Sequence, residues 1–167
     1  MGALVVMGVS GCGKSSVASA VASALHWPLI EGDGFHSAAN RAKMHAGIPL
    51  DDDDRYGWLV ALGEQLQSHP AGAVLSCSAL KRRYREQLRQ ASPGLRFAFL
   101  ELDEAAALQR VSQRPGHFFP ASVVASQFEA LEPPTGETGV LPLDALLPVD
   151  ELCRRVVAWM QAAPAAP

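Results

Sequence analysis

Three glycines, a lysine and a serine near the N-terminus have the spacing of a phosphate-binding loop. Residues 8–15 read GVSGCGKS and fit the pattern GxxxxGK[ST], directly after the apolar run of residues 4–7. Glycines allow a tight turn whose backbone N–H groups converge on one phosphate, and the helix that follows adds its positive N-terminal end. The sequence therefore predicts a nucleoside triphosphate site here, in preference to an ordinary glycine turn.

The expected nucleotide-binding residues are those of this loop and of the helix start: Gly8, Val9, Ser10, Gly11, Cys12, Gly13, Lys14, Ser15 and Ser16. Lys14 can reach the terminal phosphates, and the Ser15 hydroxyl can ligate Mg²⁺. We therefore expect Lys14 to be catalytic and Ser15 to be the protein's metal ligand.

The chain of 167 residues has the size and composition of one globular domain. Its formal net charge of −3 argues against non-specific binding to nucleic acid, but not against a small anionic substrate. No apolar run approaches the roughly 20 residues of a membrane helix, and no basic segment precedes an apolar one at the N-terminus. Cys12, Cys77 and Cys153 lack metal-binding spacing and suit free thiols. We expect a cytoplasmic protein that binds neither nucleic acid nor membrane.

Apolar and helix-forming segments alternate along the chain. Strands are expected at residues 3–8, 28–30, 72–77, 95–102 and, more weakly, 139–143. Helices are expected at 14–25, 37–46, 55–67, 81–90 and 122–131, with two more capped by Asp103 and Asp150. This alternation implies an α/β protein with a parallel sheet and helices on both faces.

Three other stretches favour a site over plain structure. EGDGFH at residues 31–36 follows the second expected strand, and four aspartates at 51–54 precede an amphipathic segment. Helix capping accounts for one or two of these acids, and Asp54 could instead order Mg²⁺ waters or Arg55. SQRPGHFFP at 112–120 combines basic and aromatic residues with two prolines, which predicts a surface loop.

Two classes of phosphate-loop protein are excluded by missing motifs. Residues 54–57 match the DxxG of a GTPase, but they follow no apolar strand and no NKxD occurs downstream. A motor ATPase would place an aspartate after a long apolar strand, whereas the third strand here ends in LSCS at 75–78. The small domain, the short second strand that ends in an acid and the arginine-bearing segment late in the chain favour a kinase of small molecules. In such a kinase the acceptor binds opposite the phosphate loop under a lid.

The sequence resembles the gluconate kinases, within the P-loop class that includes shikimate and adenylate kinases. The resemblance covers residues 5–134 and rests on ordered blocks: GVSGCGKS at 8–15, GDGFH at 32–36, NRAKM at 40–44, GIPLDDDDR at 47–55 with Trp58 and Leu59, CSALKRRYR at 77–85, GHFF at 116–119 and QFEALE at 127–132. It departs at Asp51, where the family tends to have Thr or Asn, and at Cys12, where Ser or Ala is common. Neither departure should affect the chemistry.

The resemblance implies a three-layer P-loop kinase fold. This fold has about five parallel strands in the order 2-3-1-4-5, helices on both faces and a small lid, here about residues 112–126. We expect one kinase domain over residues 1–167. Related kinases are often dimers, so a homodimer is left open.

The resemblance also implies transfer of the ATP γ-phosphate to the 6-hydroxyl of D-gluconate, with ATP and Mg²⁺ as cofactors. Asp33 is then expected to orient that hydroxyl and accept its proton, although an acid between two glycines can also serve a turn. The gluconate carboxylate needs a cation. The candidates to hold gluconate are His36, Arg41, Arg55, Lys81 and Arg82. Each basic residue could equally lie on a solvated helix surface, and the sequence does not choose among them.

Within the expected lid, Arg110 and Arg114 are four residues apart and would share one helix face. We expect Arg114 to be catalytic at the transferring phosphate, Arg110 to stack on adenine and His117 to contact the sugar. Gln127 could hydrogen-bond a sugar hydroxyl or lie on the surface. A kinase of another small polyol or acid, such as shikimate, is the alternative, and a non-catalytic ATP-binding domain is a third reading.

Overall fold

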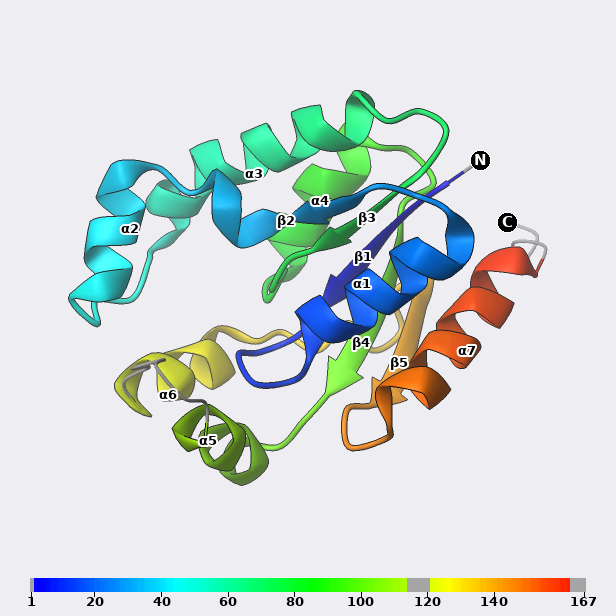
Figure 1. The fold of residues 1–167 in the computed structure, drawn as a ribbon. Coiled ribbons are helices and arrows are strands. Elements are labelled where there is room, and N and C mark those ends of the chain that lie inside the picture. The colour runs from blue at the N-terminus through cyan, green and yellow to red at the C-terminus, as the bar shows by residue number, and fades with distance from the viewer. Residues whose placement is uncertain (1, 114–120, 163–167) are drawn as a thin grey trace.

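The structure is a computed structural model that describes residues 2–113 and 121–162. At its centre is a five-stranded parallel sheet with the predicted order β2-β3-β1-β4-β5 (Figure 1). The strands are β1 (Ala3–Met7), β2 (Leu29–Glu31), β3 (Ala73–Ser76), β4 (Arg96–Glu101) and β5 (Val140–Asp144). Because all neighbouring strands pair in parallel, their carboxyl ends meet at one edge of the sheet.

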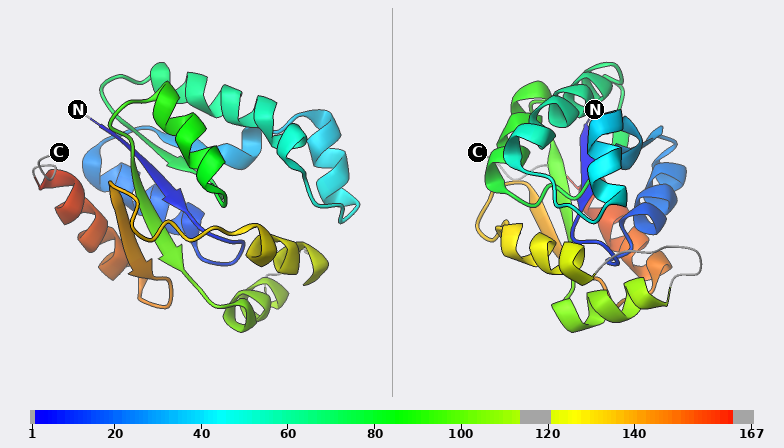
Figure 2. Two further views of the ribbon diagram at one scale, coloured as in Figure 1. Left: turned by 180° about the vertical axis from the view of Figure 1, so that it is seen from behind. Right: turned by 90° about the vertical axis from the view of Figure 1, so that its left-hand side faces the viewer.

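The helices form the two outer layers. In the described part of the chain they are α1 (Lys14–Leu25), α2 (Ala38–His45), α3 (Asp52–Gln67), α4 (Arg82–Ala91), α5 (Glu104–Ser112), α6 (Ala121–Ala130) and α7 (Val149–Gln161), together with the 3₁₀ turn η1 (Gly32–Phe35). Helices α1 and α7 cover one face of the sheet and α3 and α4 the other, while α5 and α6 lie near its carboxyl edge (Figures 1 and 2). The expected three layers are therefore present.

Strand β1 contributes to two hydrophobic cores. Leu4 and Val6 pack with α1 and α7, whereas Val5 and Met7 pack with α3 and α4. All four side chains are buried. Successive strand residues point to opposite faces, so a sheet covered on both sides requires a wholly apolar central strand. Over residues 2–113 and 121–162, none of the helices combines the length and apolar character that crossing a bilayer requires.

Two helix starts test the predicted caps. Asp103 caps α5 as predicted, since its Oδ1 accepts a hydrogen bond of 2.7 Å from Ala106 N. The predicted cap at Asp150 is wrong, because Pro148 occupies the cap position of α7 and Asp150 lies in the first turn. The proline provides the extended backbone that a cap needs, and the aspartate still contributes a negative charge near the helix N-terminus.

Capping explains the first and last of the four aspartates. Asp51 Oδ1 accepts from Asp54 N at 2.7 Å, and Asp54 Oδ2 accepts from Asp51 N at 3.0 Å, which forms a capping box on α3. Lys43 Nζ lies 2.8 Å from Asp54 Oδ2, and this bond lowers the pKa of Asp54. The alternative in which Asp54 orders Mg²⁺ waters therefore has no support in the contacts of the described residues.

Arg85 of α4 is fully buried. Its Nη1 donates to Ala79 O and its Nη2 to Glu132 O, both at 2.8 Å, and it pairs with the buried Glu137 carboxylate at 2.6 Å. A buried guanidinium is tolerated only when it is paired and hydrogen-bonded in this way. Arg85 therefore ties the loop after β3 to the segment between α6 and β5.

Candidate active site

The loop between β1 and α1 has the backbone that the GxxxxGKS pattern predicts. Gly8 has φ of 148°, and a Cβ there would lie 2.7 Å from Cys12 Sγ and 2.9 Å from Leu100 O, so only glycine fits. None of the described side chains caps α1, whose cap residue is Gly13. The first N–H groups of α1 therefore stay available to a phosphate. Lys14 Nζ donates to Val9 O at 3.2 Å and so lies against the loop.

Glu31 lies in the EGDGFH stretch that the sequence favours as a site, but no role was predicted for it. It ends β2, beside Ser76 of β3, and its Oε2 accepts a hydrogen bond of 3.2 Å from Ser15 Oγ. A hydroxyl and a carboxylate oxygen are the donor types that Mg²⁺ prefers, so this pair fits the ion that the fold implies. The available signal was an acid closing the second strand, two residues before Asp33.

A cavity of ≈ 100 Å³ lies beside the loop and brings together residues from distant parts of the chain. Its polar lining includes Lys14, Asp33, His36, Arg55, Ser78 and Gln127. Two larger surface hollows, of ≈ 710 and ≈ 590 Å³, contain none of these six side chains. Size therefore does not identify the site here. The chemistry of the lining identifies the site, because Lys14 of the phosphate loop and the Asp33 carboxylate line the same cavity.

Trp58 of α3 holds the backbone that carries Asp33. Its Nε1 donates to Gly32 O at 2.8 Å. Gly32 in turn lies so close to β3 that a Cβ there would be 2.5 Å from Ser76 O. The His36 ring stacks on Trp58 with centroids 4.3 Å apart and an interplanar angle of 17°. The GDGFH segment is therefore fixed against the sheet edge from both sides.

His36 is held as a neutral donor. It is 8% exposed, and burial lowers its pKa. Asn40 Nδ2 lies 3.3 Å from His36 Nδ1 and also donates to Asp54 O at 2.8 Å. An amide nitrogen can only donate, so Nδ1 accepts and the ring proton is on Nε2. His36 can therefore offer an N–H to a ligand oxygen in the cavity it lines.

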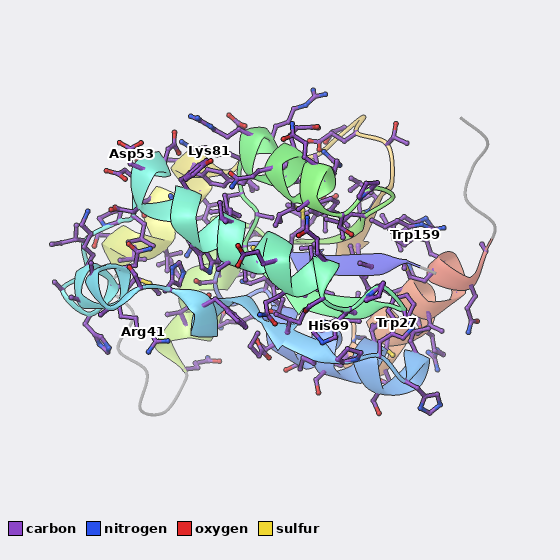
Figure 3. The ribbon with its side chains drawn as sticks, turned by 90° about the horizontal axis from the view of Figure 1, so that it is seen from above. Trp27, Arg41, Asp53, His69, Lys81 and Trp159 are labelled. Carbon is purple, nitrogen blue, oxygen red and sulfur yellow. The ribbon has the colours of Figure 1, made fainter. Side chains whose placement is uncertain are left out.

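The structure separates the basic candidates for a carboxylate ligand. Of the four arginine and lysine candidates, only Arg55 lines the cavity. Arg41 donates to Gly34 O at 2.8 Å, Lys81 pairs with Asp52 at 2.9 Å, and the exposed Arg82 lies 3.9 Å from a glutamate one turn further on. In Figure 3, Lys81 lies beside the N-terminal end of α3, whereas Arg41 lies well apart from it on α2.

The remaining site candidates lie around the loop. Gln127 of α6 lines the cavity and makes two hydrogen bonds with Ser10. Its Oε1 accepts from Ser10 N at 2.6 Å, and its Nε2 donates to Ser10 Oγ at 3.0 Å. Arg110 donates to Gly11 O at 3.1 Å and to Ala145 O at 3.0 Å, away from the lining of the cavity. Contacts of Gln127 with a sugar and of Arg110 with adenine stay predictions. Arg114 and His117, in the expected lid, lie outside the described residues.

Comparison with known proteins decides the family. A family model described as an AAA domain matches residues 4–134. The thermoresistant gluconokinase of Escherichia coli (strain K12) is 44% identical over 150 residues, which cover 87% of this chain and 86% of that protein. The chain belongs to the gluconokinase family.

Other gluconokinases support this assignment. The gluconokinase of Gluconobacter oxydans (strain 621H) is 41% identical over 162 residues, covering 95% of this chain and 91% of that protein. The crystal structure of a gluconokinase from Sinorhizobium meliloti 1021 matches with a TM-score of 0.88 and 49% identity, over 94% of this chain and 90% of that chain. The predicted P-loop kinase fold is thus confirmed as the gluconokinase fold.

Proposed function

We propose that this protein transfers the γ-phosphate of ATP to the 6-hydroxyl of D-gluconate, giving 6-phospho-D-gluconate and ADP. Membership of the gluconokinase family supports the reaction. The observation that carries it is a single cavity lined by Lys14, Asp33 and Arg55. These supply, in one place, a cation for the phosphate, a base for the hydroxyl and a guanidinium for the carboxylate.

The nucleotide would bind with its triphosphate on the loop of residues 8–16. Lys14 and the N–H groups at the start of α1 would stabilise the charge that shifts during transfer. Ser15 and Glu31 are the described residues that would hold Mg²⁺, which neutralises the β- and γ-phosphates when bound. We place Arg110 beside adenine, because it spans the loop and the turn after β5. Arg114 at the transferring phosphate remains part of the same proposal.

The acceptor would bind in the cavity next to Lys14. The Arg55 guanidinium faces the gluconate carboxylate, and His36 Nε2 donates to a hydroxyl. Asp33 takes the 6-hydroxyl proton as that oxygen bonds to the γ-phosphorus and the bond to the β-phosphate oxygen breaks. Trp58, Ile48 and other apolar residues of the lining restrict water, which would otherwise accept the phosphate.

An acceptor panel tests the proposal. The purified protein is incubated with ATP, Mg²⁺ and, in separate reactions, gluconate, other sugar acids, polyols and shikimate, and ADP release is measured. We expect release that depends on gluconate. A good rate on shikimate or another polyol, with none on gluconate, would support the alternative acceptor, and binding of ATP without any transfer would support the non-catalytic reading.

Three further points stay predictions from the sequence. They are a single kinase domain over residues 1–167 with a lid near 112–126, the open possibility of a homodimer, and a cytoplasmic location. Limited proteolysis with and without ATP tests the lid, because closure over the nucleotide would protect that segment. Sedimentation tests the dimer.

A further inference from the structure

The orientation of Arg55 decides whether it can bind a carboxylate in the cavity. Both hydrogen bonds that the described residues make with it use Nη1, to Leu50 O at 2.5 Å and to the Tyr84 hydroxyl oxygen at 3.3 Å. Its Cζ also lies 5.6 Å from the centre of the Tyr84 ring. The side of the guanidinium that carries Nη2 is therefore the side left for a ligand.

The Tyr84 hydroxyl has a fixed direction. It donates to Asp52 Oδ1, which also receives Lys81 Nζ at 2.9 Å, while Arg83 Nη1 lies 2.9 Å from Asp52 Oδ2. The hydrogen bonds from Tyr84 and Lys81 lower the pKa of Asp52 to about 2. The pKa of Tyr84 is raised, mainly because the side chain is buried and also because its hydroxyl bonds Asp52. At neutral pH the carboxylate is thus charged and the phenol protonated. The phenol oxygen is then free to accept from Arg55.

We propose that Asp52 and Tyr84 are positioning residues that act through Arg55 and hold its free side toward the carboxylate of the acceptor. The proposal rests on the proposed function, in which Arg55 meets that carboxylate. It also gives a role to an aspartate that capping leaves unexplained. Asp52 lies in the first turn of α3 and Tyr84 in α4, so a purely structural bond would only tie these two helices together.

Three single variants separate a role in positioning Arg55 from a bond that only ties α3 to α4. Tyr84→Phe and Asp52→Asn each remove one link, and Asp53→Asn is the matched control, because Asp53 lies in the same turn without an ion pair or hydrogen bond to any side chain in the described part of the chain. Initial rates are measured against gluconate and against ATP, together with melting temperatures. We expect the gluconate KM to rise about fivefold in the first two variants, with the ATP KM within about twofold of wild type. The control should match wild type.

An Arg55→Gln background shows whether the effect passes through the guanidinium. If it does, adding Tyr84→Phe or Asp52→Asn to Arg55→Gln weakens gluconate binding by less than about twofold more, as measured by calorimetry. The same fivefold loss in both backgrounds, an equal rise in the ATP KM, or no change in the single variants would overturn the proposal. Should Tyr84→Phe fail to fold, Asp52→Asn carries the same comparison.

The two proposals fail in different ways. A wild-type protein that neither binds nor phosphorylates gluconate overturns the proposed function and this inference together. A wild-type protein that phosphorylates gluconate, with Tyr84→Phe and Asp52→Asn behaving like Asp53→Asn, overturns the inference alone.

Discussion

The phosphate loop and the acceptor cavity are built from different parts of the chain. The loop depends on backbone conformation within a few consecutive residues, as the positive φ of Gly8 and Gly13 shows. The cavity depends on side chains from η1, α3, α6 and the loop after β3, held by bonds such as that from Trp58 to Gly32. The first kind of site shows directly in residue spacing, and the second appears only once the chain is folded.

This difference predicts different responses to substitution. A loop that depends on backbone conformation should lose stability and nucleotide affinity in one step when a glycine gains a side chain, because the strain cannot be relieved locally. A cavity built from side chains should lose affinity in steps, one contact at a time.

Loss of the proposed base should have the largest effect on turnover. Asp33→Ala should lower kcat by roughly 10²- to 10⁴-fold, because no other group is expected to accept the hydroxyl proton. Its Kd for ATP, measured by calorimetry, should stay near the wild-type value, whereas Lys14→Ala should lose turnover and also weaken ATP binding. Full activity in Asp33→Ala would show that the assigned base is wrong.

Gly8→Ala should damage the phosphate loop. The added Cβ would meet Cys12 Sγ and Leu100 O at a φ that alanine rarely adopts, so we expect a loss of about 1–3 kcal/mol in unfolding free energy and a higher ATP KM. Gly57→Ala is the control, since a Cβ there meets nothing within 4 Å and the residue lies inside α3. It should stabilise the protein by up to about 1 kcal/mol in urea unfolding. Equal effects at the two glycines would refute the contrast.

Trp58→Phe should weaken the acceptor side alone. It keeps much of the apolar ring but leaves Gly32 O without its indole donor, so the gluconate KM should rise roughly fivefold while the ATP KM stays unchanged. Trp159→Phe serves as the control, because Trp159 packs against Arg96, does not line the cavity, and lies at the opposite end of the molecule from Asp53 and Lys81 (Figure 3). A matching rise in the ATP KM would mean that Trp58 supports the whole fold and not the acceptor segment.

Acid should remove a small contribution from Asp52. Its folded pKa of about 2 lies below its ordinary value of 3.8, so its stabilisation is complete above that ordinary value and is lost as the pH falls toward 2. Urea unfolding of wild type and Asp52→Asn should therefore differ more at pH 5 than at pH 2.5. Because the carboxylate is partly exposed, we expect the difference to stay below about 1 kcal/mol. A gap that is equal at both pH values would contradict the lowered pKa.

The phosphate loop was predictable because it depends on local pattern, namely the glycine spacing after an apolar run. The alternation of segments predicted only a parallel sheet with helices on both faces. The order of the strands came from the resemblance to the gluconate kinases, because strand order depends on contacts between segments far apart in the chain. Glu31 was not predictable, because its carboxylate meets Ser15 only after β2 has packed beside β3. The bond between Asp52 and Tyr84 joins residues 32 positions apart, and no local pattern reports such a pairing.

The same limit applies to Trp58, which the sequence marks only as part of a block of the resemblance. Its bond to Gly32 O joins segments far apart in the chain, so the partner of the indole N–H was not predictable. For the cation that would bind the gluconate carboxylate, the sequence could supply only a set of candidate basic residues. The folded chain then places Arg55 in the lining of the cavity, whereas Lys81 and Arg41 bond acceptors outside it.

The buried Arg85 limits how the molecule can open. Its guanidinium pairs with Glu137, which also pairs with Arg89, and it donates to Glu132 O, while Glu132 N donates to Leu80 O at 2.8 Å. Pulling residues 132–137 away would strand a positive charge in an apolar interior, at a cost far above that of bending an exposed turn. If α6 swings to admit or release a ligand, its pivot should therefore lie before residue 132, and everything after it should move with the sheet as one rigid body.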